Sequence, residues 1–353
     1  MSVPVSSGIN VQTINTSRLS TRVLFKGDEQ ATPVLFVHGN ASSATWWEPT
    51  ILALPEQFRA IAPDLRGYGD ASPDAKIDAT KGAGDWSDDL ADLLSALNIE
   101  KVHMVAISMG GAIAWQFMMD HAEKLLSVTV VNPCSPYGYG GTKDIAGTPC
   151  YDDYAGSGAG LVNPLFVERI AAKDTGTDHP FSPRKALQGL VTNPASLGEF
   201  EDAFLAALLS VHLGEQDYPG DVVASTNWPY FSPGIWGSNN AISPKYIRKP
   251  DALYAVSNKP PVLWIRGDRD LTVADSAAID PATLGKFGLI PNYPGEETYP
   301  AQPMVSQTRA VLEQYQKSGG SYKEVVLESA GHLCYMDKPD EFNKHLFQHL
   351  SSV

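Results

Sequence analysis

Three side chains that lie far apart in the sequence could together perform nucleophilic catalysis. Ser108 lies in the stretch AISMGG, where an apolar segment that ends at Ile107 gives way to helical spacing. A serine hydroxyl is a weak nucleophile until a base removes its proton, and the base needs an acid that orients it. His332 in LESAGHLCYMDKP and Asp270 in WIRGDRDLTV each follow an expected strand, so they are the candidates for base and acid.

Ser108 has two interpretations. A nucleophile at a sharp strand–turn–helix junction has strained backbone geometry, so the residues two before and two after it must be small, as Ala106 and Gly110 are. Gly111 would let the helix pack closely, and the turn would aim the backbone N–H of Met109 at an oxyanion. In the other interpretation Ser108 only caps the helix. This segment alone does not decide between them.

Other acids and histidines fit the chemistry less well. His332 follows Gly331, which permits a turn, and Asp270 lies three residues after Gly267. Asp268 is the alternative acid, but we expect it to shape the turn through an Asx-type hydrogen bond. The remaining histidines are expected in a strand, on helices or in loops, namely His38, His103, His121, His179, His212, His345 and His349.

Strands and helices alternate along most of the chain. We expect an antiparallel pair in 10–25, strands at 32–39, 101–107, 125–133, 260–270 and 322–329, a strand running into a loop at 58–69, and helices at 42–55, 85–98, 109–123 and 339–350. Such alternation is typical of a parallel sheet with right-handed crossovers. The sequence therefore predicts an α/β fold, with a mostly parallel central sheet flanked by helices.

The alternation stops between residues 134 and 259. This segment is rich in glycine, tyrosine and proline, with two or three helical pieces such as 165–173 and 198–213. We therefore predict one core, residues 1–133 and 260–353, interrupted by a largely helical lid insertion at 134–259. The lid would cover the carboxyl ends of the strands, where sheets of this kind place their sites. A second, loop-rich insertion is expected at 283–304.

These motifs resemble the α/β-hydrolase superfamily. The order of the candidate residues, Ser then Asp then His, is that of the family, although Ala106 stands where its G-x-S-x-G motif has glycine. The resemblance covers about 10–133 and 260–352 and is carried by HGN (38–40), DLRGYGDAS (64–72), AISMGG (106–111), GDRDLTV (267–273) and AGHLCYMDKP (330–339).

The resemblance implies a role for each residue. Ser108 would be the nucleophile, His332 the general base and then acid, and Asp270 the group that fixes the imidazole tautomer. The backbone N–H groups of Asn40 and Met109 would form the oxyanion hole. It further implies that the imidazole of His38 holds the oxyanion loop, and that Asp64 and Arg66 form a loop-stabilising ion pair.

A serine nucleophile limits the kinds of reaction that the protein could catalyse. An acyl-enzyme on Ser108 fits the hydrolysis of a carboxylic ester or lactone of a small, fairly apolar molecule. Two enzymatic alternatives are a C–C bond hydrolase of the meta-cleavage type and an amidase, and a third is a non-catalytic member of the fold that binds a small molecule. Candidate substrate contacts, which could instead pack within the lid or core, are Trp46, Tyr137, Trp228 and Trp236.

Composition limits the partners. The net charge of −14 over 353 residues argues against nucleic acid, and no apolar run reaches the roughly 18 residues of a membrane span. The start lacks the pattern of a secretion signal, and Cys134, Cys150 and Cys334 suggest reduced thiols, so we expect a cytoplasmic protein. No metal-binding or dinucleotide motif is visible, so no cofactor is predicted. A homodimer is compatible with the sequence.

Overall fold

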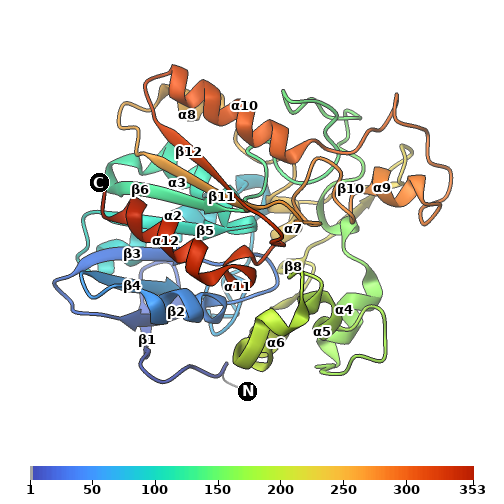
Figure 1. The fold of residues 1–353 in the computed structure, drawn as a ribbon. Coiled ribbons are helices and arrows are strands. Elements are labelled where there is room, and N and C mark those ends of the chain that lie inside the picture. Colours follow the sequence, from blue (N-terminus) through green and yellow to red (C-terminus); the bar gives the residue numbers. More distant parts are fainter. Residues whose placement is uncertain (1–2) are drawn as a thin grey trace.

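The computed structural model describes residues 3–353, whose largest element is an eight-stranded sheet (Figure 1). Its strand order is β1-β2-β4-β3-β5-β6-β11-β12. β2 pairs antiparallel with both β1 and β4, and all other neighbours are parallel. The predicted α/β fold is thus confirmed. The strands are β1 (Asn10–Asn15), β2 (Ser20–Lys26), β3 (Thr32–Val37), β4 (Phe58–Pro63), β5 (Val102–Ile107), β6 (Leu125–Val131), β11 (Val262–Gly267) and β12 (Tyr322–Leu327).

Helices cover both faces of this sheet. On one side α2 (Gly84–Ala96) and α8 (Asp251–Ala255) pack against α3 (Met109–Asp120), and α10 (Met304–Lys317) contacts α8. On the other side α12 (Pro339–Leu350) packs on β11 and β12, next to α1 (Glu48–Ala53) and α11 (Cys334–Asp337) (Figure 1). Every residue of β5 is buried, which explains its almost unbroken apolar sequence.

The segment 134–259 combines short helices with two small sheets. The helical pieces expected near 165–173 and 198–213 correspond to α4 (Pro164–Ala171) and α6 (Glu201–Leu209), and α5 (Pro183–Gln188) and α7 (Ser238–Ala241) were not anticipated. Four short strands were not anticipated either. They pair as β7 (Leu213–Gly214) with β8 (Tyr218–Pro219), and β9 (Val222–Ala224) with β10 (Phe231–Pro233).

Hydrogen bonds tie this segment to loops that follow the core strands. Trp46, after β3, donates its indole N–H to the Phe204 carbonyl of α6. The backbone N–H of Leu333, after β12, donates to the carbonyl of Leu190. Because both loops lie at the carboxyl ends of their strands, the parts of this segment around Leu190 and Phe204 lie beside that edge of the sheet, where Figure 1 shows α4, α5 and α6, whereas its last helix, α8, packs on α3.

The second loop-rich region begins within α9 (Pro281–Lys286), and its tyrosines form a small aromatic cluster with Trp228 of the segment 134–259. Trp228 packs edge-on against Tyr299, with ring centroids 4.9 Å apart, and Tyr293 lies 5.3 Å from the same indole. This cluster is separate from the main core.

Candidate active site

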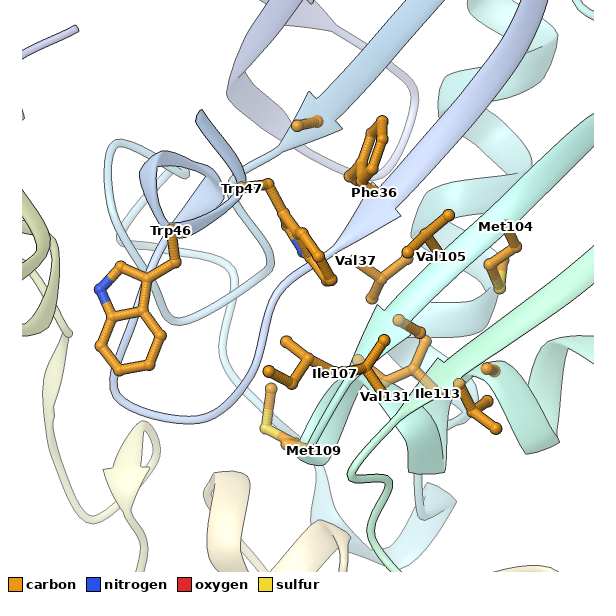
Figure 2. Packing of buried hydrophobic residues seen from close by; sticks show 14 of the residues in the cluster. Phe36, Val37, Trp46, Trp47, Met104, Val105, Ile107, Met109, Ile113 and Val131 are labelled. Atoms are coloured by element: carbon orange, nitrogen blue, oxygen red, sulfur yellow. The ribbon is translucent and has the colours of Figure 1, made fainter. Parts of the chain in front are cut away.

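Ser108 occupies a strained turn between β5 and α3. Its φ of 56° and ψ of −120° lie in a region that side chains other than glycine rarely adopt. Figure 2 shows apolar side chains of β5, β6 and α3 gathered around this turn. The turn depends on small neighbours, because a Cβ added to Gly110 would lie 2.7 Å from the His38 carbonyl oxygen, and one on Gly111 would lie 2.4 Å from the Cβ of Pro133.

The backbone around Ser108 is held by the strand beside it. Its N–H donates to the Val131 carbonyl at 3.1 Å, and its carbonyl accepts from Gly111 at 2.9 Å and from Cys134 at 2.8 Å. Ser108 stands at the N-cap position of α3, yet its side chain makes no capping hydrogen bond within residues 3–353. Helix capping therefore does not account for this serine, and its half-buried hydroxyl is left free for other chemistry.

Asp270 and His332 form a buried pair. The imidazole Nδ1 lies 2.8 Å from Asp270 Oδ2, and the two residues are only 6% and 4% exposed. The other carboxylate oxygen accepts the backbone N–H groups of Thr272 (2.7 Å) and Val273 (3.0 Å), which fix its orientation. Because a carboxylate only accepts hydrogen bonds, Nδ1 must carry the proton, which leaves Nε2 as an acceptor in the neutral ring.

Ser108 is connected to the loop of His332 through hydrogen bonds of the turn Val131–Cys134, not by a direct bond between the two side chains. No hydrogen bond connects its hydroxyl with the imidazole in the part of the chain that the structure describes. The turn that holds Ser108, Val131–Cys134, also contains Asn132, whose side chain donates to the His332 carbonyl at 2.6 Å. The structure thus brings the predicted acid and base together, and the turn that anchors Ser108 also contacts the loop of His332.

The loop after β3, which is predicted to form the oxyanion hole and is called the oxyanion loop below, lies directly against Ser108. A Cβ added to Gly39 would be 3.1 Å from the Cβ of Ser108 and 3.7 Å from its Oγ. The Asn40 carboxamide accepts from Tyr68 Oη at 2.6 Å and donates to Asn239 Oδ1 at 3.0 Å, so the loop is held from two sides. The N–H of Met109 begins α3 and therefore has no partner within the helix.

His38 holds this loop, as the sequence predicts. Its Nε2 accepts the backbone N–H of Leu65 at 3.0 Å, so Nδ1 carries the proton and donates to the Gly39 carbonyl at 2.8 Å. The ring is completely buried, and burial lowers the pKa of His38 from 6.5 to about 4. The imidazole therefore remains neutral, which its acceptor role requires.

This burial predicts a loss of stability in acid. Between about pH 6.5 and 4 the unfolded chain protonates His38 while the folded protein does not, so acid favours unfolding. The free energy of unfolding should lose about 1.4 kcal/mol per pH unit from this residue. Urea unfolding of wild type and His38→Gln across this range should show a shallower decline in the variant, and equal slopes would contradict the assignment.

Two sequence-based expectations about charged residues are wrong. Asp64 and Arg66 do not pair with each other, because their side chains point to different neighbours. Asp64 pairs with Arg22 of β2 at 3.3 Å, whereas Arg66 makes two 2.7 Å bonds to Asp89 of α2. Asp268 does not form a local Asx turn; it accepts the backbone N–H of Ala330 at 3.3 Å and so links the loops after β11 and β12.

The four aromatic candidates for substrate contact lie in different surroundings. Trp46 is buried and stacks on Phe204 of α6 with ring centroids 5.6 Å apart, and in Figure 2 it lies apart from the apolar side chains around Ile107. Tyr137 and Trp236 are half-buried. Trp228 lies in the separate aromatic cluster described above. A substrate role for these residues stays a prediction.

Two polar residues were missed or undervalued by sequence reasoning. Asn239 is not among the predicted site residues, yet its carboxamide oxygen accepts a hydrogen bond from Asn40 of the oxyanion loop. Asn132 is not among the predicted site residues either, although its place directly after β6 is a usable signal. Its carboxamide contacts the segments of both acid and base.

Residues 3–353 contain neither a candidate metal site nor a helix that could span a membrane. Among residues 3–353, no three His, Cys, Asp or Glu side chains gather in a way that could hold a metal ion. Over the same range, every helix is too short or too polar to cross a bilayer.

Two curated proteins match parts of the chain. These relatives are an uncharacterized carboxylesterase, nap, of Bacillus subtilis (27% identical over 168 residues, 45% of this chain and 55% of the relative) and 3-oxoadipate enol-lactonase 1 of Acinetobacter baylyi (30% over 123 residues, 35% and 45%). The chain thus spans about half the length of these relatives.

The fold of a solved structure is similar to this one over nearly the whole chain. The crystal structure of carboxylesterase CesB (YbfK) from Bacillus subtilis superposes with a TM-score of 0.60 at 17% identity, covering 99% of this chain and 94% of that one. The pattern of the alpha/beta hydrolase fold family matches residues 32–299, which include Ser108 and Asp270. With its sheet order and the turn at Ser108, this match shows that the chain belongs to the alpha/beta hydrolase fold family.

Proposed function

We propose that this protein is a serine carboxylesterase that cleaves an ester or lactone of a small, fairly apolar molecule. The observation that carries the proposal is the strained Ser108 beside the oxyanion loop, whose hydroxyl makes no capping hydrogen bond within residues 3–353, together with the buried pair of Asp270 and His332. The carboxylesterase and lactonase names of the partial relatives support the same reaction class.

The reaction proceeds through an acyl-enzyme. Ser108 Oγ attacks the substrate carbonyl carbon while His332 Nε2 takes the hydroxyl proton, and the backbone N–H groups of Asn40 and Met109 stabilise the oxyanion. When the tetrahedral intermediate collapses, the alkoxide leaves with the proton from His332. Water then attacks the acyl carbon, His332 takes its proton and returns it to Ser108, and the carboxylic acid is released.

The missing Ser108–His332 hydrogen bond is compatible with this role, since such bonds are often long or poorly aligned without substrate and tighten on binding. Asp270 prevents rotation of the ring and stabilises the imidazolium that forms during each half-reaction.

Residues 134–259 are proposed to act as the lid. Their hydrogen bonds with Trp46 and Leu333 support this role, since those residues belong to the loops with the proposed oxyanion hole and His332. Apolar side chains such as Trp46 and Tyr137 would then enclose the acyl or alcohol part of the substrate.

A labelling experiment tests the nucleophile and the reaction class together. Wild-type protein should react with a fluorophosphonate, and peptide mass spectrometry should place the adduct on Ser108. It should also hydrolyse 4-nitrophenyl acetate and butyrate. Faster cleavage of a vinylogous 1,5-diketone would favour the C–C hydrolase, and faster cleavage of anilides the amidase. An unlabelled protein that turns over none of these substrates would overturn the proposal in favour of a binding protein.

A further inference from the structure

Asn132 is a buried residue that connects two loops through one side chain. It directly follows β6, is 2% exposed and has a φ of 39°. Its Nδ2 donates to the carbonyl oxygens of His332 at 2.6 Å and Gly331 at 3.2 Å. Its Oδ1 accepts the backbone N–H of Gly267 at 3.1 Å, three residues before Asp270.

The same short turn also holds the nucleophile. Val131 accepts the backbone N–H of Ser108, Cys134 donates to the Ser108 carbonyl, and Pro133 packs on Gly111 of α3. The end of β6 therefore contacts the segments of all three proposed catalytic residues. Asn132 is the member of this turn that acts through its side chain and reaches two of them.

We propose that Asn132 is a positioning residue that sets the imidazole of His332 against Asp270. This inference rests on the proposed function, since it concerns the same site. The arrangement requires one acceptor and one double donor in a single planar group, which is what a carboxamide offers. An ionised carboxylate of the same shape would accept from Gly267 but would place its second oxygen against two carbonyl oxygens.

Other contacts hold the same loop without reaching the acid. The Asp337 carboxylate accepts the backbone N–H of Gly331 at 2.7 Å, and Leu190 accepts that of Leu333 at 2.8 Å. These bonds should keep the loop folded when Asn132 is replaced. The expected effect is a displaced imidazole rather than an unfolded loop.

The Asn132→Asp variant tests this role through kinetics and proton NMR. At pH 8 its kcat for 4-nitrophenyl butyrate should fall about 10²-fold with little change in KM, because small misplacements of a catalytic group cost about that much. The far-downfield resonance of the His332 Nδ1–H should shift or disappear. The carboxyl should have a raised pKa in this buried site, and once protonated it can donate to His332, so the kcat ratio of variant to wild type should rise as pH falls.

Two further variants make the result decisive. Gln307→Glu makes the same amide-to-acid change at a fully buried carboxamide, one that donates to Thr142 and Asp144, and should leave kcat and the resonance unchanged. Asn132→Gly removes the side chain while glycine tolerates the positive φ, and should lower kcat without the recovery in acid. If Asn132→Asp does not fold, the Asn132→Gly variant still tests the positioning role.

The outcomes separate this inference from the proposed function. Wild-type kcat and an unchanged resonance in both Asn132 variants would overturn the positioning role, as would equal losses in Gln307→Glu. If wild type hydrolyses no ester, the proposed function fails, but the resonance still reports whether Asn132 sets the His332–Asp270 bond.

Discussion

Replacing Ser108 with alanine should lower kcat for ester hydrolysis by about 10⁴- to 10⁶-fold and abolish fluorophosphonate labelling. The reason is that the substitution removes the only atom placed to attack a carbonyl carbon in the proposed mechanism. The oxyanion loop and the pair of Asp270 and His332 should remain in place, since neither is bonded to the Ser108 hydroxyl. The measurement is the steady-state rate with 4-nitrophenyl butyrate, with active enzyme counted by labelling.

The control is a serine whose hydroxyl has a local role. Ser95 of α2 donates to the Ala91 carbonyl at 2.9 Å, so Ser95→Ala makes the same atomic change away from the site and should keep wild-type activity. Both variants should have circular dichroism spectra like that of wild type. A Ser108→Ala protein that keeps more than about one percent of the rate would show that another group is the nucleophile.

The sheet could be predicted because its inner strands are buried on both faces. The apolar stretches that become β3, β5 and β6 end at turn residues, and their boundaries in the structure differ from the expected ones by a few residues. The pairing of Asp270 with His332 could be predicted from their positions in the loops that follow β11 and β12, whereas their roles as acid and base stay a prediction. Parallel strands bring their carboxyl ends to one edge, so residues 62 positions apart, Asp270 and His332, meet within 2.8 Å.

Side-chain partners between distant segments could not be predicted. Asp64 and Arg66 are neighbours in the sequence, but each pairs with a residue of another element, Arg22 or Asp89. The contacts of Asn132 likewise depend on the backbone of loops that follow two other strands. Sequence spacing contains no information about such partners until the strand order is known.

One long helix was also absent from the expectations. α10 follows a loop-rich stretch, and its buried face includes the polar side chains of Gln307 and Thr308 next to Val311 and Leu312. Buried polar residues weaken the apolar periodicity that indicates an amphipathic helix. Gln307 is buried because its carboxamide joins α10 to residues 135–144 through hydrogen bonds.

Replacing Asp270 with asparagine should lower kcat by about 10⁴-fold while KM changes little. In the protein Asp270 Oδ1 accepts two backbone N–H groups, from Thr272 and Val273. The carboxamide oxygen of asparagine would keep those bonds, which turns its NH₂ group toward His332 Nδ1. His332 Nδ1 must then accept a hydrogen bond from this NH₂ group, so the imidazole proton moves to Nε2. The ring can then no longer take the proton of Ser108.

The neighbouring acid supplies the matched control for this prediction. Asp268 is the alternative acid; it accepts the Ala330 N–H and pairs with the exposed Arg269 rather than with His332, so Asp268→Asn should retain most of the activity. Because a wrong tautomer leaves the nucleophile and the pocket intact, Asp270→Asn should still bind substrate with near-normal affinity. If Asp268→Asn instead shows the larger loss, the acid has been assigned to the wrong carboxylate. If both variants remain fully active, the imidazole is oriented by the backbone alone, and the mechanism needs no acid.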